Sequence, residues 1–141
     1  MSVLTRPRVV LRLEGLVLAV ALLGAAVWLV PDWWWVLPAG FLLVDLSALG
    51  YLRGPRAGAA WYNAGHSTVG PVLLGLVAGG LAVSGADGTA QVVCTTTALT
   101  WGFHVAVDRA FGYGLKEPDS FHHTHLGWLA GRSSRSPEER A

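Results

Sequence analysis

Four acidic or histidine side chains inside otherwise apolar stretches are the residues of this sequence best suited to catalysis. They are Glu14, Asp45, His104 and Asp108. Ionisable groups in a lipid-embedded segment are costly, and by default they mark functional sites. His104 and Asp108 are four residues apart, which places both on one face of a helix. A buried carboxylic acid suits a general acid and a histidine–aspartate pair suits a base, so we expect these four residues to be catalytic.

A second set of polar and aromatic residues surrounds these four along the chain. We expect this set to bind substrate: Tyr51, Trp61, Tyr62, Asn63, His66, Trp101, Phe103, Arg109, Tyr113, Lys116 and His125. The aromatic rings can also stabilise a developing cation. The neighbouring His122 and His123 are interpreted instead as histidines of the membrane interface.

The same side chains allow a metal-dependent interpretation. Imidazole and carboxylate together form a mixed nitrogen and oxygen ligand set that suits iron, zinc or manganese. The ligands in that case are Glu14, Asp45, His66, His104, Asp108 and His125. The acid–base interpretation requires no cofactor, and the sequence does not decide between the two.

Composition indicates that these residues belong to an integral membrane protein. Of the 141 residues, 52% are hydrophobic and 13% are charged, whereas soluble domains carry about 25% charged residues. A spanning helix needs about 20 mostly apolar residues, which predicts spans at 11–30, 33–52, 58–83 and 89–111. We therefore expect one all-α domain over 1–131, a four-helix membrane bundle. An interfacial segment at 112–131 closes this domain, and a polar tail at 132–141 is expected to be disordered.

Charge distribution predicts the orientation of the bundle. All ten lysines and arginines lie in segments that the four spans place on one side, and the opposite loops carry only Asp32 and Asp87. The positive-inside rule then predicts a multi-pass protein of the cytoplasmic (inner) membrane with both termini in the cytoplasm. The basic residues suit anionic lipid headgroups, and no nucleic-acid partner is expected.

The predicted depths of the ionisable groups favour one shared cavity. All four spans place them in the cytoplasmic half of the bilayer, at a rise of about 1.5 Å per residue. We expect a lipophilic small-molecule substrate that enters from the cytoplasmic leaflet. Cyclisation or isomerisation of an isoprenoid-type molecule, or opening of an epoxide, would fit this chemistry.

Two alternatives to an enzyme stay open at this point. Intramembrane carboxylates and histidines also form proton relays, which would suit a proton-coupled transporter or channel. The polar groups could instead only cross-link helices, although such hydrogen bonds average about 0.6 kcal/mol in lipid.

Small residues in the spans can also determine how closely helices pack and whether chains associate. Gly75 and Gly79 have GxxxG spacing, and we expect them to pack within the bundle rather than to form a dimer interface. A homo-oligomer is nevertheless left open.

The motifs together resemble the Domain of Unknown Function 4260 family of small bacterial membrane proteins. The matching segments are 12–15, 45–51, Gly58 with 62–66, 104–109, 111–116 and 124–127. Val44 stands where the family often has proline, and His122 and His123 do not match the pattern. The resemblance implies a four-helix membrane fold and marks the same polar residues. It implies no particular reaction.

Overall fold

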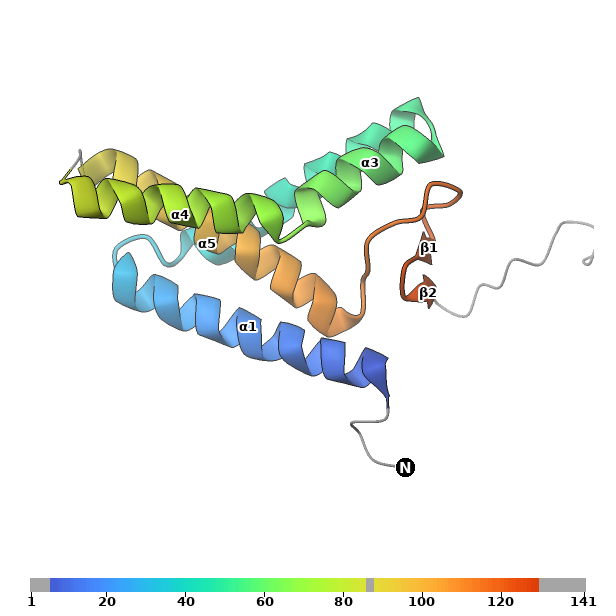
Figure 1. The fold of residues 1–141 in the computed structure, drawn as a ribbon, viewed down its shortest axis with the longest axis horizontal. Helices are drawn as coiled ribbons and strands as arrows, with labels where there is room; N and C mark the ends of the chain where they lie inside the picture. The colour runs from blue at the N-terminus through green and yellow to red at the C-terminus, as the bar shows by residue number, and fades with distance from the viewer. Residues whose placement is uncertain (1–5, 86–87, 130–141) are drawn as a thin grey trace, which may run out of the picture.

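The computed structural model describes residues 6–85 and 88–129. The elements are α1 (Pro7–Leu29), α2 (Val36–Ala39), the 3₁₀ helix η2 (Phe41–Arg53), α3 (Pro55–His66), α4 (Val69–Ser84), α5 (Gly88–Phe111), β1 (His123–Thr124) and β2 (Gly127–Trp128) (Figure 1). The two short strands pair as an antiparallel hairpin. The predicted polar tail at 132–141 lies outside the described residues, as do 86–87 and 130–131.

Three helical stretches are long and apolar enough to cross a membrane. They are Pro7–Leu29, Val36–Arg53 and Pro55–Ser84, and they correspond to the first three predicted spans. The expectation of an all-α, membrane-type protein is therefore confirmed in these coarse terms. The fourth predicted span forms α5, which is long enough at 24 residues but is not among the three stretches.

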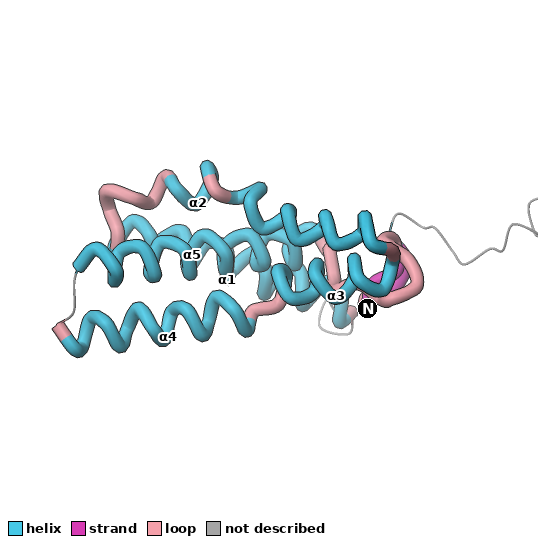
Figure 2. Tube along the Cα trace, turned by 90° about the horizontal axis from the view of Figure 1, so that it is seen from above, coloured by secondary structure: helices cyan, strands magenta, loops and turns pink. Residues whose placement is uncertain are grey.

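Helix α5 differs from the others because it occupies the centre of the molecule. It contacts α1, α4, α2 and η2, and Figure 2 shows α1 and α4 running alongside it. Seven of its residues are buried, among them Thr96, Thr100 and His104. A helix that is covered by other helices needs fewer lipid-facing apolar side chains, which explains its more polar composition.

The second span is mostly a 3₁₀ helix, which the sequence did not indicate. After a turn at residues 31–35 the chain forms α2 and then η2, a 13-residue 3₁₀ run. Such runs rarely exceed three or four residues, and each residue rises about 2.0 Å instead of about 1.5 Å. Thirteen residues therefore cover about 26 Å, and residues three apart, such as Asp45 and Ala48, lie in one row.

The third span breaks after His66, although the sequence predicted one continuous helix over 58–83. Ser67 is extended, with φ −81° and ψ 144°. Pro71 explains the break, because its ring would clash with the carbonyl of Ser67 in an uninterrupted helix and it has no N–H to donate there. The two parts, α3 and α4, meet at an angle (Figure 1).

Gly15 brings α1 close to α5, whereas Gly75 and Gly79 on α4 do not pack as expected. A Cβ atom at Gly15 would collide with the backbone of Ala106 and Ala110 on α5. At Gly75 and Gly79, in contrast, an added Cβ would meet nothing within 4 Å. The expected packing role of the GxxxG pair within the bundle is therefore wrong.

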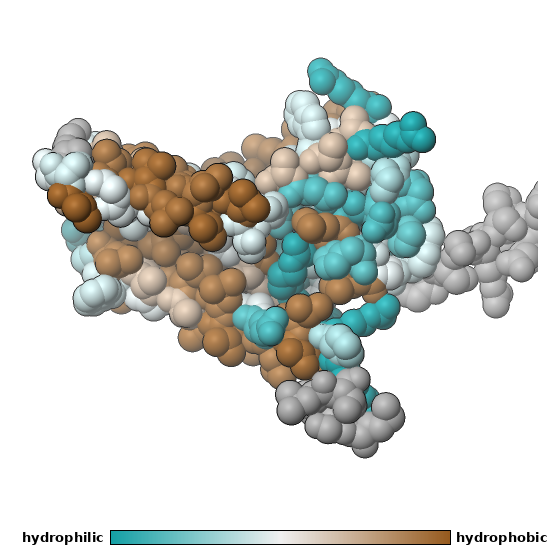
Figure 3. Space-filling view, in the orientation of Figure 1, coloured by the Kyte–Doolittle hydropathy of each residue, from teal (hydrophilic) through white to brown (hydrophobic). Residues whose placement is uncertain are grey.

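The polar residues gather at one end of the molecule. The start of α1, the α3 helix and the hairpin lie at this end, and the turn at residues 31–35, the end of α4 and the start of α5 lie at the other (Figure 1). On the visible face, hydrophilic residues concentrate over α3 and the hairpin segment, whereas α4 and the neighbouring part of α1 are hydrophobic (Figure 3). We refer to these as the hairpin end and the turn end.

Candidate functional site

Two histidines and two aspartates meet at the hairpin end, and we refer to Asp45, His66, His104 and Asp108 as the His/Asp cluster. Asp45 comes from η2, His66 is the last residue of α3, and His104 and Asp108 lie on α5. The Nε2 atoms of the two histidines are 3.1 Å apart. Asp45 Oδ1 is 3.5 Å from Nε2 of His66 and 3.6 Å from Nε2 of His104. The corresponding distances from Asp108 Oδ2 are 3.4 Å and 3.8 Å.

The cluster is buried on its histidine side and open on one aspartate side. The side chains of His66 and His104 are each 1% exposed, and that of Asp108 is 15% exposed. Asp45 is 47% exposed, so it forms the accessible edge. The ring of Phe41 lies 4.5 Å from that of His104 and covers it.

Contacts with Tyr62 orient His66. Nδ1 of His66 lies 3.0 Å from the backbone carbonyl oxygen of Tyr62. A carbonyl only accepts hydrogen bonds, so Nδ1 carries the proton and Nε2 of the neutral ring presents a lone pair to the cluster. The two rings stack at 3.6 Å, and the Tyr62 hydroxyl donates to Asp108 Oδ2 at 3.1 Å. Ser47 Oγ, a residue that the sequence analysis did not select, is 3.4 Å from the same Nδ1.

The break after α3 is stabilised by side chains of α5. The indole N–H of Trp101 donates to the Gly65 carbonyl, and Nη2 of Arg109 donates to the His66 carbonyl at 3.2 Å. These carbonyls lose their helical partners at the break and need others in an apolar environment. Trp101 and Arg109, expected to bind substrate, therefore hold the backbone that carries His66.

The segment after α5 is fixed to α3 by a reciprocal pair of hydrogen bonds. The Asn63 side chain donates to the Lys116 carbonyl at 2.9 Å and accepts from the Lys116 N–H at 2.7 Å. The Lys116 ammonium lies 4.1 Å from the ring centre of Phe121 and 4.8 Å from that of Tyr62. Burial lowers the pKa of Lys116, and the Asp108 carboxylate opposes that shift. Lys116 thus lies close enough to the cluster for the Asp108 charge to affect its pKa.

Three predicted site residues do not join the His/Asp cluster in the described part of the chain. Glu14 is exposed on α1, so its expected catalytic role receives no geometric support. His125 accepts a hydrogen bond from the Leu115 N–H at 2.9 Å within the terminal segment. Trp61 is exposed beneath the Arg53 guanidinium.

Three further predicted substrate-binding residues pack around the site rather than in it. Tyr51 packs edge-on against Phe121 at 5.2 Å. Phe103 packs against Phe41 at 6.0 Å. Tyr113 accepts a hydrogen bond from Arg109 through its carbonyl.

Three members of the cluster, Asp45, His66 and His104, lie close enough together to hold a metal ion. Charge-assisted N–H···O hydrogen bonds are about 2.7–2.9 Å long, and all four histidine–aspartate distances exceed this range. Ligand atoms around a tetrahedral ion with bonds of about 2.0–2.1 Å lie about 3.3–3.4 Å apart. Asp45, His66 and His104 form one triangle of this size, and His66, His104 and Asp108 form another. The two Nε2 atoms are also within hydrogen-bond distance of each other, so a proton on one of them is the alternative to a bound ion.

An apolar groove lies beside the cluster. It has a volume of about 390 Å³, and its lining includes Val44, Ser47, Gly65 and Trp101. Val44 is the neighbour of Asp45 in the chain and Gly65 is the neighbour of His66. No cluster residue lines the groove, and Ser47 links the two, because its Oγ lies 3.4 Å from His66 Nδ1.

Comparison with known proteins assigns the chain to a family but does not assign it an activity. No curated protein and no solved structure matches the chain. One family model, described as "domain of unknown function (DUF4260)", matches residues 8–129. The match includes all four residues of the His/Asp cluster. The expectation from the sequence motifs is confirmed, and the chain belongs to the DUF4260 family.

Proposed function

We propose that this protein is a membrane enzyme whose His/Asp cluster holds one divalent metal ion and acts on a lipophilic small molecule. The observation that carries the proposal is that ligand atoms of Asp45, His66 and His104 all lie within 4.8 Å of one another, close enough to hold one ion. The proposal selects the metal-dependent interpretation of the sequence over the metal-free acid–base one.

Charge and orientation support a divalent ion. Asp45 and Asp108 together offset a charge of +2, so the loaded site is neutral, which suits a buried position in lipid. The hydrogen bond from Nδ1 of His66 to a backbone carbonyl is the usual support of a metal-bound imidazole. Mixed imidazole and carboxylate ligands suit zinc, iron or manganese. Such an ion would supply Lewis-acid activation of a water molecule or of an oxygen atom on the substrate.

The accessible edge determines how substrate would arrive. Asp45 is the exposed member of the cluster, and the 390 Å³ groove reaches the cluster through Ser47. Its apolar lining favours hydrocarbon, and Ser47 offers a hydroxyl close to His66. A substrate with a hydrocarbon body and one oxygen-bearing group satisfies both features.

The proposal includes the membrane arrangement predicted from the sequence. In it α5 is the fourth span and both termini are cytoplasmic, because Arg8, Arg12, Arg53, Arg56 and Lys116 lie at the hairpin end. Cysteines placed at Ser84 and at Ser120 in a Cys94→Ala background test this. A membrane-impermeant maleimide should label Ser84→Cys in intact cells and Ser120→Cys only after the membrane is opened. The reverse pattern would contradict the orientation.

Metal binding by purified protein tests the site itself. The full chain in detergent is stripped with a chelator, reloaded separately with Zn²⁺, Mn²⁺ or Fe²⁺, and measured by elemental analysis and calorimetric titration. We expect one ion per chain, and affinity more than about 100-fold weaker in His66→Gln and His104→Gln. His125→Gln and Asp119→Asn are matched controls in the terminal segment and should bind like the wild type.

Two outcomes would overturn the metal centre. One is the absence of stoichiometric binding for all three ions in folded protein. The other is unchanged affinity in His66→Gln and His104→Gln. Either result would leave a proton shared between the two histidines and would return the site to metal-free acid–base chemistry.

A further inference from the structure

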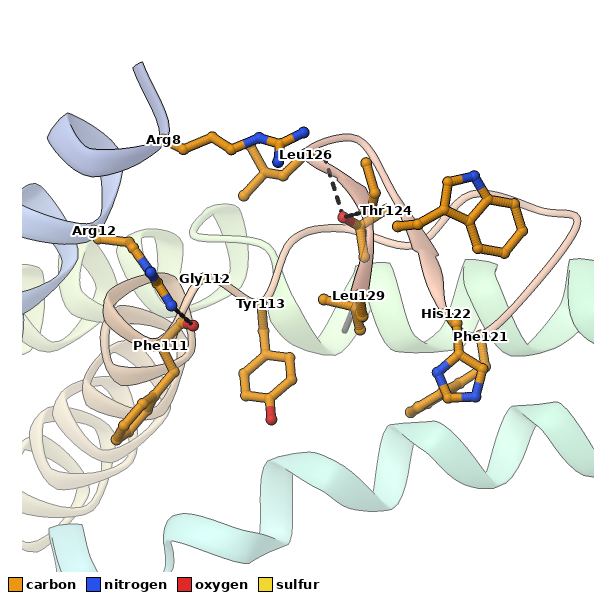
Figure 4. A pocket seen from close by; sticks show the side chains of 12 residues that line it. Arg8, Arg12, Phe111, Gly112, Tyr113, Phe121, His122, Thr124, Leu126 and Leu129 are labelled. Atoms are coloured by element: carbon orange, nitrogen blue, oxygen red, sulfur yellow. Dashed lines mark hydrogen bonds between the residues drawn. The ribbon is translucent and has the colours of Figure 1, made fainter. Parts of the chain in front are cut away.

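A second site, separate from the His/Asp cluster, lies where the start of α1 meets the hairpin segment. It is a cavity of about 520 Å³, and its lining includes Arg8, Arg12, Tyr113, Phe121 and Trp128. Figure 4 shows both arginine side chains extending from α1 toward this segment. In the described part of the chain, neither guanidinium has a carboxylate within ion-pair distance. The cavity therefore carries two positive charges that no carboxylate among the described residues neutralises.

Two glycines allow the arginines to lie against the backbone of this segment. Gly112 has φ +89° and Gly127 has φ +101°, conformations that glycine adopts without strain. A Cβ at Gly112 would meet the guanidinium of Arg12, and a Cβ at Gly127 would meet that of Arg8. Arg12 also donates to the Phe111 carbonyl at 2.6 Å. Its guanidinium is thus held in place, with further N–H groups left to bind an anion.

An apolar groove continues directly from this cavity. It has a volume of about 510 Å³, runs between α1 and α5, and shares Arg12 and Phe111 with the basic cavity. Its lining on α1 includes Leu16, Val20 and Leu23. From Arg12 to Leu23 the helix rises about 16 Å, which is about half of the 30 Å hydrocarbon core of a bilayer.

One face of α1 therefore changes from basic to apolar in the direction that leads into the membrane. Arg8, Arg12, Leu16 and Val20 follow one another at intervals of four residues, so they lie along one side of the helix. Phe103, Val107 and Phe111 form the facing row on α5. A phosphate group at the arginines and a hydrocarbon chain along the groove would each meet a matching surface.

We propose that the basic cavity and this groove together bind one anionic phospholipid of the adjacent leaflet. Its phosphate contacts Arg8 and Arg12, and one acyl chain lies between α1 and α5. Arginine is suited to this role because its planar guanidinium binds phosphate through two parallel hydrogen bonds. Bound there, the lipid connects α1 to the hairpin segment. This inference does not depend on the metal site.

Native mass spectrometry of the full chain in detergent tests the site. Wild-type protein is titrated with a phosphatidylglycerol and with a phosphatidylcholine that has the same acyl chains. We expect phosphatidylglycerol to be retained at least about fivefold better, and each of Arg8→Gln and Arg12→Gln to lower that retention about fivefold. Arg56→Gln, an exposed arginine on α3, is the charge-matched control and should bind like the wild type.

A second pair of variants tests the acyl chain. Val20 lines the groove and is 64% exposed, whereas Val17 is 68% exposed on the same helix but does not line it. Val20→Trp should lower phosphatidylglycerol retention, and Val17→Trp should not. Inorganic phosphate at millimolar concentration should displace no lipid, because it offers nothing to the groove.

Any of four results would overturn the proposal. They are equal retention of the two lipids, equal behaviour of the Arg8 and Arg56 variants, equal behaviour of the Val20 and Val17 variants, and displacement by inorganic phosphate. Arg12→Gln also removes the bond to Phe111, so folding of that variant is checked by circular dichroism. The Arg8 side chain makes no hydrogen bond within the described residues, so Arg8→Gln keeps the test decisive if the Arg12 variant is unstable.

Discussion

The hairpin end and the turn end share helices α1 and α5 but stabilise their buried residues in different ways. At the turn end, Ala26, Val30, Leu37 and Leu99 form an apolar core. At the hairpin end the buried side chains include His66, His104 and Lys116, each placed by defined contacts. In lipid, apolar residues gain from close fit more than from leaving water. The turn end is therefore stabilised by the close fit of its side chains. The stability of the hairpin end depends instead on charge and on the orientation of individual polar atoms.

Metal should stabilise the hairpin end most strongly. A ligand present at about 1,000 times its dissociation constant adds about 4.1 kcal/mol to the free energy of unfolding. Wild-type protein in detergent should therefore melt at a higher temperature with saturating metal than with chelator, and His66→Gln should melt at the same temperature in both. An equal gain in wild type and variant would mean that the ion binds elsewhere.

Truncation of Leu37 should weaken the turn end without affecting metal binding. Leu37 is 0% exposed, so Leu37→Ala leaves a cavity that costs about 2–3 kcal/mol, toward the lower part of the range for buried leucine. Leu42→Ala, at a residue that is 71% exposed, is the control and should change stability by less than about 0.5 kcal/mol. Denaturant titration measures both, and equal losses would contradict a packed core around Leu37.

Enlarging Gly15 should separate α1 from α5. A side chain at Gly15 collides with α5, whereas one at Gly24 meets nothing within 4 Å. Gly15→Leu should therefore cost about 1–3 kcal/mol of stability through overpacking, and Gly24→Leu should cost much less. Thermal unfolding of the two variants in the same detergent measures the difference. Similar stability would show that the helices separate there without cost.

The smallest effect concerns the hairpin segment at low pH. The His123 ring lies 2.8 Å from the Asp119 carboxylate, and this hydrogen bond lowers the Asp119 pKa below its ordinary 3.8. A lowered carboxylate pKa adds stability above about pH 3.8 that is lost as the pH falls through the folded value. The protection of the Thr124 amide against exchange, relative to its intrinsic rate, should fall between pH 5 and pH 3 more in wild type than in Asp119→Asn. Identical profiles would mean that the pair does not hold the hairpin.

Residue type identified the chemically important part of the site before any geometry was known. Asp45, His66, His104 and Asp108 were selected because ionisable groups are rare in apolar segments, and the structure brings all four together. Glu14 was selected for the same reason but is exposed. It precedes Gly15, which faces α5, and one residue turns a helix by about 100°. Composition therefore finds an ionisable residue in a span but does not determine which way it faces.

The irregular backbone was harder to predict. A proline inside the third apolar stretch indicates a break in the helix. Pro71 is such a residue, but a span predicted from hydropathy alone takes no account of it. The 3₁₀ conformation of η2 had no comparable sequence signal, and neither did the roles of Phe41 and Ser47. Their positions beside His104 and His66 arise from contacts between helices that are distant in the chain.

By itself the sequence determined that the chain is a helical membrane-type protein of its family and that its polar residues form a small, unusual set. Local composition is sufficient for this, because the cost of placing charge in lipid acts on each residue separately. Only the tertiary structure decided which members of the set meet. That depends on the rotation of each helix about its axis, on the break after His66 and on the carbonyls that Trp101 and Arg109 bind there. Those features exist only when all the helices are packed together.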